Sequence, residues 1–221
     1  MFRIKWAEFA EYCYTHGKAK WNFDGWLGET LFKEASGWRK RFEAVQKTLA
    51  QLNPYETVLD LMCGGAYPSR KIAQQAKRVI AVDVDGEALS FAKNKIREEQ
   101  LENVELIRCD VCHLPFKDKS VDVSLNIGGI EWFRNSKMEK MLKEAEKVTR
   151  KAIIVTFTSE AFKNKLHYKL RLVHLRMLLA KAGMPRIRRK EEFKQFLKRL
   201  FPATTMTQVG YFIIAELHTT L

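Results

Sequence analysis

Cysteine and proline are scarce in this chain of 221 residues, which contains four Cys and five Pro. Four cysteines in a chain of this length exclude a disulfide framework and favour a reducing environment. Cys109 and Cys112 form a CxxC, but no second pair completes a metal site, so we expect no bound metal. No window comes near the roughly 18 uncharged apolar residues of a membrane-spanning helix. An acid as early as Glu8 argues against an export signal, and we therefore expect a cytoplasmic protein.

Internal repeats, low-complexity tracts and Pro/Ser-rich linkers are absent as well, so nothing in the composition divides the chain. Hydrophobic residues make up 46% of the sequence, which is enough for a core and argues against disorder. We expect a single domain over residues 1–221. Its expected parts are an aromatic helical cap (1–53), a core (54–158), and basic helices with closing strands (159–221).

The whole chain has a formal net charge of +13, and its positive charge is concentrated towards the C-terminal end. Residues 159–221 hold thirteen Lys or Arg and four Asp or Glu, whereas residues 56–158 hold seventeen and sixteen. A solvated helical face is the simplest explanation. The alternative is a site for an anionic partner such as RNA, an acidic small molecule or a lipid headgroup.

Short β-rich runs alternate with helical patterns from Pro54 onwards, which predicts an α/β fold. Such alternation implies parallel strands joined by right-handed crossovers. In a sheet of this kind, ligands bind outside the carboxyl ends of the strands, near the switch point. The predicted strands are 57–62, 79–83, 104–108, 121–126, 152–157 and 209–217, and the predicted helices begin at Pro68 or span 86–99, 136–149, 161–182 and 190–201.

Two acids and a glycine pair follow the first two predicted strands. Asp60 ends a buried apolar run, and Gly64-Gly65 form a tight turn in which backbone can approach a ligand. Asp83 follows some twenty residues later, where a carboxylate can accept two hydrogen bonds from a ribose diol. The glycine pair alone is weak evidence, but together with the spacing and the second acid it indicates a nucleotide-type site.

The stretch 58–66, VLDLMCGGA, resembles the first motif of class I S-adenosylmethionine-dependent methyltransferases, and 82–85, VDVD, resembles their second. Residues 103–123 are similar to the family's third- and fourth-strand region, closest to the branch of ubiquinone/menaquinone-type enzymes. The resemblance covers residues 55–158. It implies S-adenosylmethionine as cofactor. The fold it implies is Rossmann-like and doubly wound, with a mostly parallel seven-stranded sheet and an antiparallel C-terminal hairpin strand.

The resemblance also implies roles for individual residues. The Gly64-Gly65 turn passes along the methionine moiety of the cofactor, and Asp83 holds the ribose hydroxyls. Asp110 accepts from the adenine amino group, with a backbone amide from Val111. The segment 126–128 lines the methyl-transfer face. The full set implied for the cofactor is Asp60, Cys63, Gly64, Gly65, Asp83, Val84, Asp110, Val111, Asn126, Ile127 and Gly128.

Met62 and Ala66 stand where the family usually has glycine, and we expect both side chains to crowd the turn. A non-catalytic binding protein that keeps the methyltransferase fold is therefore an alternative. A nicotinamide-dependent dehydrogenase is disfavoured, because the G-x-G-x-x-G spacing is absent.

Four residues are candidates for contact with the acceptor. Glu131 follows the fourth predicted strand and is the candidate catalytic group, although a carboxylate near a helix N-terminus is an equally good explanation. Tyr67, Trp132 and Trp26 are candidate substrate contacts, with simple packing as the alternative. Alignment of donor and acceptor supplies much of the rate of such a transfer, so a base is needed only when the acceptor keeps its proton.

The acceptor class is left open by the motifs. Residues 162–201 contain thirteen basic residues and two acidic ones. Lys and Arg opposite Phe and Leu suit a peripheral membrane contact or a lipid-like substrate, and the same charge suits RNA phosphates. We expect a small-molecule or lipid-like acceptor, with a tRNA or rRNA methyltransferase as the alternative, because no RNA-binding module is recognisable.

Overall fold

The computed structural model describes the parallel core of the chain and its C-terminal strands. The described residues are 7–8, 10–11, 15, 40–51, 55–130, 133–158, 190–209 and 212–219. The predicted helix over 161–182 lies outside them. The strands are β1 (Thr57–Leu61), β2 (Arg78–Asp83), β3 (Val104–Arg108), β4 (Val121–Ile127), β5 (Thr149–Thr158), β6 (Thr204–Val209) and β7 (Phe212–His218). The helices are α3 (Tyr67–Ile72), α4 (Gly86–Glu98), α5 (Asn135–Val148) and α7 (Lys190–Leu200), together with a helix over 40–51.

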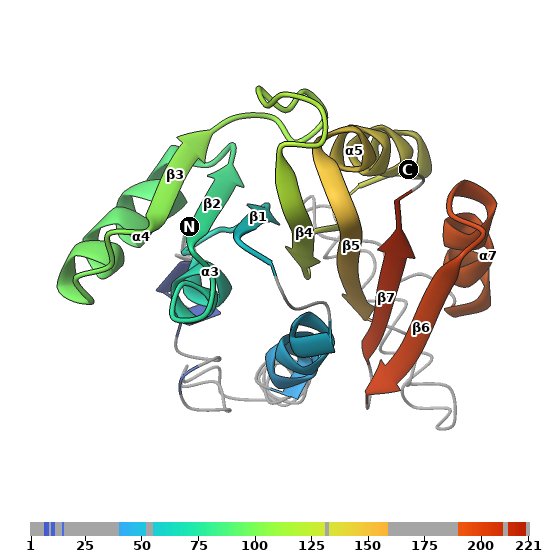
Figure 1. Ribbon diagram of the computed structural model, residues 1–221, viewed down its shortest axis with the longest axis horizontal. Helices are drawn as coiled ribbons and strands as arrows, with labels where there is room; N and C mark the ends of the chain where they lie inside the picture. The colour runs from blue at the N-terminus through green and yellow to red at the C-terminus, as the bar shows by residue number, and fades with distance from the viewer. Residues whose placement is uncertain are drawn as a thin grey trace, which may run out of the picture.

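All seven strands of the described residues join one sheet, in the order β3-β2-β1-β4-β5-β7-β6 (Figure 1). The strands from β1 to β5 pair in parallel, and β7 pairs antiparallel with both β5 and β6. The chain runs outwards from β1 through β2 to β3, and then returns to place β4 on the other side of β1. This reversal puts the switch point between β1 and β4, where ligands of such folds bind.

Helices cover both faces of the sheet, because parallel strands bury both of their faces. Met141 and Leu142 of α5 and Leu197 of α7 pack against one face, with strand residues such as Leu59 and Val82. The helix over 40–51 packs against the other face with Phe42, Val45 and Leu49, beside Val58 and Ile154; α4 covers Ala81 on that same face.

The fold class and the first five strands are confirmed, each within a few residues of its expected bounds. One strand is wrong: the predicted strand over 209–217 contains the end of β6 and most of β7. The sequence did not predict β6, because its residues, TTMTQV, are mostly polar. This strand lies half-exposed at the edge of the sheet, and it therefore lacks the continuous apolar run that indicates a buried strand. The seven-stranded sheet and its antiparallel C-terminal hairpin are nevertheless as expected.

Within the described part of the chain, no helix is both long enough and apolar enough to cross a membrane. The expectation of one domain over residues 1–221 stays a prediction.

Candidate active site

The turn after β1 opens a space at the carboxyl edge of the sheet. Its backbone is tied down by two hydrogen bonds, from the Cys63 amide to the Val82 carbonyl (3.0 Å) and from the Ala66 amide to the Cys63 carbonyl (2.8 Å). Gly64 has a φ of +53°, and a Cβ built on it would meet no atom within 4 Å. The turn therefore exposes bare backbone to an open space next to β2.

Asp83 connects the end of β2 to this turn. Its Oδ2 accepts a hydrogen bond from the Gly64 amide at 2.8 Å, and its Oδ1 accepts one from the Asp85 amide at 2.9 Å. A carboxylate has about four acceptor sites, so each oxygen retains one for a further donor. The pair of oxygens is thus held in a fixed orientation and is still able to accept from a diol.

Val84 presents an apolar side chain next to this carboxylate. Its side chain is large and apolar, and the residue is nevertheless 65% exposed. Arg108 fixes its backbone by donating from Nε to the Val84 carbonyl at 3.0 Å. Exposed apolar surface beside a polar site is what a bound ring would cover.

Asp110 follows β3 and faces the same edge. Its Oδ1 accepts a hydrogen bond from the Cys112 amide at 3.0 Å, and this bond is the main reason that the pKa of Asp110 lies below its usual value. Its carboxylate is 44% exposed. Val111, the next residue, is buried. Asp110 is therefore ionised and accessible to a donor at neutral pH.

Asp60 is buried below the turn, at 2% exposure. Ser69 donates to its Oδ2 at 2.5 Å. Burial raises the pKa of Asp60 to about 7, in spite of that hydrogen bond. The residue anchors α3 beneath β1, and its side chain is enclosed by the protein.

Asn126 is also enclosed, at 0% exposure, where β4 ends. Its Nδ2 donates to the Leu61 carbonyl at 2.8 Å, and its Oδ1 accepts from the amides of Gly129 (3.3 Å) and Ile130 (2.8 Å). These bonds hold the end of β1 against the loop that follows β4. The expected place of Asn126 and Ile127 on the methyl-transfer face stays a prediction, whereas the positioning role of Asn126 is visible.

The two departures from the glycine pattern fall at left-handed positions, with φ of +62° at Met62 and +55° at Ala66. Glycine adopts this region freely, and other residues do so with strain. Met62 lies against Gly129 and packs on the core of the α5 face, and the methyl of Ala66 packs against Leu89. Both side chains thus contact the protein's own core, and neither comes within 4 Å of a Cβ built at Gly64.

Tyr67 packs beside the turn rather than standing free. Its ring meets that of Phe42 edge-on, with centroids 5.9 Å apart, and lies 5.5 Å from both Arg70 Cζ and Lys71 Nζ. The packing explanation accounts for these contacts, and a contact with substrate stays a prediction. The candidates Trp26, Glu131 and Trp132 lie outside the described residues.

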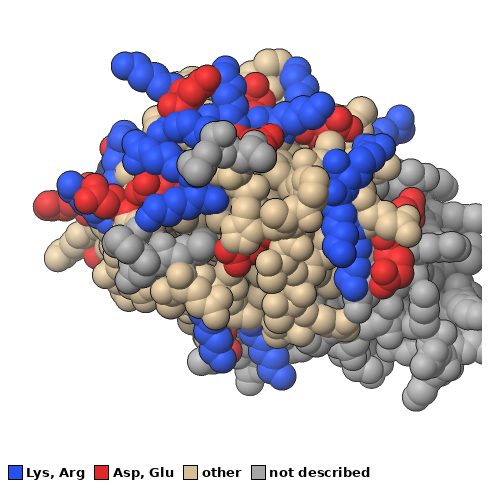
Figure 2. Space-filling view, turned by 45° about the vertical axis from the view of Figure 1, so that its right-hand side comes forward, with Lys and Arg blue, Asp and Glu red and all other residues tan. Residues whose placement is uncertain are grey.

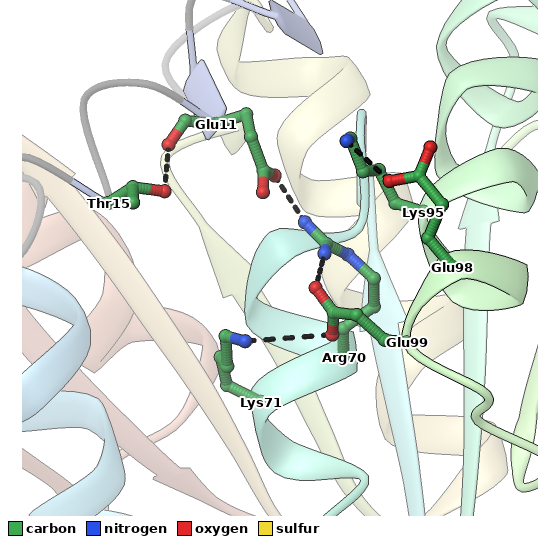
Figure 3. A network of polar contacts seen from close by, with 7 residues as sticks. All are labelled: Glu11, Thr15, Arg70, Lys71, Lys95, Glu98 and Glu99. Atoms are coloured by element: carbon green, nitrogen blue, oxygen red, sulfur yellow. Dashed lines mark hydrogen bonds and ion pairs between the residues drawn. The ribbon is translucent and has the colours of Figure 1, made fainter.

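An ion-pair cluster that the sequence did not indicate joins the N-terminal segment to the core (Figure 3). Arg70 of α3 is fully buried, and it pairs with both Glu11 and Glu99. Close by, a Cβ built on Gly65 would lie 3.3 Å from the Ala7 side chain. Ala7 therefore lies on the turn, and nothing in the local sequence links Glu11 to residue 70.

Surface charge is mixed on one face of the described part of the molecule (Figure 2). On the face shown in Figure 2, Lys and Arg stand beside Asp and Glu. Glu139 pairs with both Lys143 (2.9 Å) and Arg199 (3.4 Å). Among the described residues, no group of three metal-ligating side chains is present.

Comparison with known proteins shows what the core of the chain is similar to. Residues 58–152 match the family model described as a methyltransferase domain. A probable S-adenosylmethionine-dependent methyltransferase of Mycobacterium tuberculosis is 34% identical over 94 residues, which are 42% of this chain and 32% of the relative. A malonyl-[acyl-carrier protein] O-methyltransferase of Pectobacterium atrosepticum is 28% identical over 137 residues, 59% of this chain and 51% of the relative. The chain thus spans about a third to a half of the length of these relatives.

A solved structure extends the likeness in fold to nearly the whole chain. Magnesium protoporphyrin IX methyltransferase from Synechocystis, with bound S-adenosylhomocysteine, superposes with a TM-score of 0.70 at 17% identity, over 98% of this chain and 93% of that one. The cofactor implied by the sequence motifs, S-adenosylmethionine, is the one that the relatives' names specify. Residues 58–152 of this chain thus match a methyltransferase domain, and relatives that match this core are S-adenosylmethionine-dependent methyltransferases.

Proposed function

We propose that the protein transfers a methyl group from S-adenosylmethionine to a small-molecule or lipid-like acceptor. The observation that carries the proposal is the Asp83 carboxylate, bound to the Gly64 amide beside an open space. When bound, S-adenosylmethionine supplies an electrophilic methyl group on a sulfonium. The residues present fit such a molecule, because they offer acceptors for a ribose diol, an apolar surface and bare backbone side by side.

Each described residue of the site has a distinct part in this proposal. Asp83 would accept the two ribose hydroxyls, and Val84 would cover one face of the adenine ring. Asp110, ionised and accessible, would accept from the adenine amino group. Gly64 would leave room for the amino-acid end of the cofactor.

The proposed acceptor class rests on the relatives and on the surface. Relatives matching the core include malonyl-[acyl-carrier protein] and demethylmenaquinone methyltransferases. On the face shown in Figure 2, described Lys and Arg stand beside Asp and Glu, which supports a small acceptor over a long polyanion. The basic segment 162–201 would serve a peripheral membrane contact, with RNA binding as its competitor.

A methyl-transfer assay tests the proposal. The purified protein is incubated with S-adenosylmethionine labelled in its methyl group, together with either a solvent extract of cell lipids and small molecules or total RNA. We expect label in the extract, and its loss in Asp83→Asn. The matched control Asp118→Asn removes an exposed loop carboxylate and should keep full activity. Label in RNA alone would overturn the acceptor class, and label in neither fraction would overturn the enzymatic function.

A further inference from the structure

Arg70 of α3 joins parts of the chain that lie far apart in the sequence. Its side chain is fully buried, and Figure 3 shows the guanidinium between two carboxylates. One belongs to Glu11, near the N-terminus, and the other to Glu99, the residue at which α4 ends. Because a buried charge that loses a partner is strongly destabilising, these two ion pairs fix the position of α3.

α3 is also bonded to both sides of the turn after β1. The Ser69 hydroxyl donates to Asp60 Oδ2 at 2.5 Å, and the Arg70 amide donates to the Ala66 carbonyl at 3.0 Å. Only nine positions separate Asp60 in β1 from Ser69 in α3. The turn is therefore a short stretch of chain whose far end is α3 itself, and the position of α3 sets the position of the Gly64 amide.

The same two neighbours, the N-terminal part of the chain and α4, also lie directly against the turn. A Cβ built on Gly65 would be 3.3 Å from the Cβ of Ala7 and 3.1 Å from Cδ1 of Phe91 in α4. The Cβ built on Gly64 meets nothing within 4 Å. The two glycines thus differ: Gly64 leaves space beside the turn, whereas Gly65 allows the turn to be packed closely from behind.

We propose, resting on the methyltransferase function above, that Glu11 is a positioning residue for the cofactor, which it influences through Arg70 and the turn. The Gly64 amide donates to Asp83 Oδ2 at 2.8 Å, and this bond orients the carboxylate assigned to the ribose hydroxyls. A binding group has to be held within about 0.5 Å of its productive position. Removing the Glu11 carboxylate releases one of the two anchors of Arg70. Cofactor binding and the Glu11–Arg70 pair therefore stabilise each other, because coupling between two sites is reciprocal.

Calorimetry with S-adenosylhomocysteine tests this role. We expect Glu11→Gln to bind it at least about fivefold more weakly than the wild type, which is the lower end of typical coupling between sites. Glu99→Gln releases the other anchor of Arg70 and should weaken binding as well. The matched control Glu105→Gln also breaks an Arg–Glu pair, the exposed one with Arg78 at 2.7 Å, and should bind like the wild type.

Hydrogen exchange separates positioning from mere stability. In the folded protein without cofactor, the Gly64 amide should exchange faster in Glu11→Gln than in the wild type, and at an unchanged rate in Glu105→Gln. A purely structural role would lower the urea midpoint and leave both the exchange rate at Gly64 and the affinity of the folded protein unchanged.

The possible results lead to different conclusions. A folded Glu11→Gln protein that binds S-adenosylhomocysteine within about twofold of the wild type would overturn the inference, as would an equal loss of affinity in Glu105→Gln. If Glu11→Gln does not fold, Glu99→Gln carries the same comparison, and unchanged affinity there overturns the inference. No binding by the wild type would overturn the proposed function itself, whereas wild-type affinity in the variants would overturn only the positioning role.

Discussion

Gly64→Ala distinguishes a space that binds cofactor from a space that is merely empty. The added methyl meets no protein atom within 4 Å, so it costs no packing energy in the free protein. The φ of +53° remains, and an L-residue in the left-handed region is strained by roughly 1–2 kcal/mol. We therefore expect urea denaturation to show a loss of stability of about 1–2 kcal/mol and no more.

Cofactor affinity should respond more strongly. If the methionine moiety occupies the space, the methyl overpacks the complex, which costs about 1–3 kcal/mol, or at least about fivefold in affinity for S-adenosylhomocysteine by calorimetry. Ala66→Gly is the matched control: it relieves left-handed strain, loses a buried methyl, and should change both stability and affinity little. A Gly64→Ala protein that binds S-adenosylhomocysteine within about twofold of the wild type would refute this reasoning.

Three further predictions concern the buried polar groups. Burial raises the pKa of Asp60 to about 7, so the folded state holds a proton that the unfolded state releases near pH 4. The free energy of unfolding should therefore fall from pH 4 to pH 7, by no more than about 4 kcal/mol. In urea titrations at pH 5 and pH 8, Asp60→Asn should show a smaller decline than the wild type. Arg70→Met leaves Glu11 and Glu99 without their buried cation and should cost about 3 kcal/mol in urea denaturation, whereas the exposed Arg78→Met should cost less than about 1 kcal/mol; equal losses would contradict the account. Asn126→Ala orphans three backbone groups and should lower the thermal midpoint by roughly ten degrees or more, and an unchanged midpoint would contradict its positioning role.

Local signals explain why the core was predictable. The runs at 57–61 and 78–83 are apolar because both faces of a parallel sheet are buried, and Asp85 caps α4 by accepting from the Glu87 amide at 2.9 Å. Asp83 and Gly64 were identifiable because their spacing reflects the turn and crossover of this fold. The structure adds that they contact each other, which the spacing alone does not state.

Contacts between distant segments explain what sequence reasoning missed. Arg70 meets residues 11 and 99, and Arg41 meets Gly128, through tertiary packing that no periodicity encodes. The sequence predicted that Met62 and Ala66 would crowd the turn. In the structure, the backbone is left-handed at both positions, and both side chains pack on the core. The sequence pattern does not encode these backbone angles.

The central claim is that the Asp83 carboxylate and the turn after β1 together bind an adenosine-containing cofactor. Isothermal titration of S-adenosylhomocysteine into the wild type, Asp83→Asn and Asp118→Asn tests it most directly. The account predicts saturable one-to-one binding by the wild type and by Asp118→Asn, and a loss of at least about tenfold in Asp83→Asn, as expected when a charged acceptor is removed. Equal affinity of Asp83→Asn and the wild type, or no binding by the wild type, would contradict it.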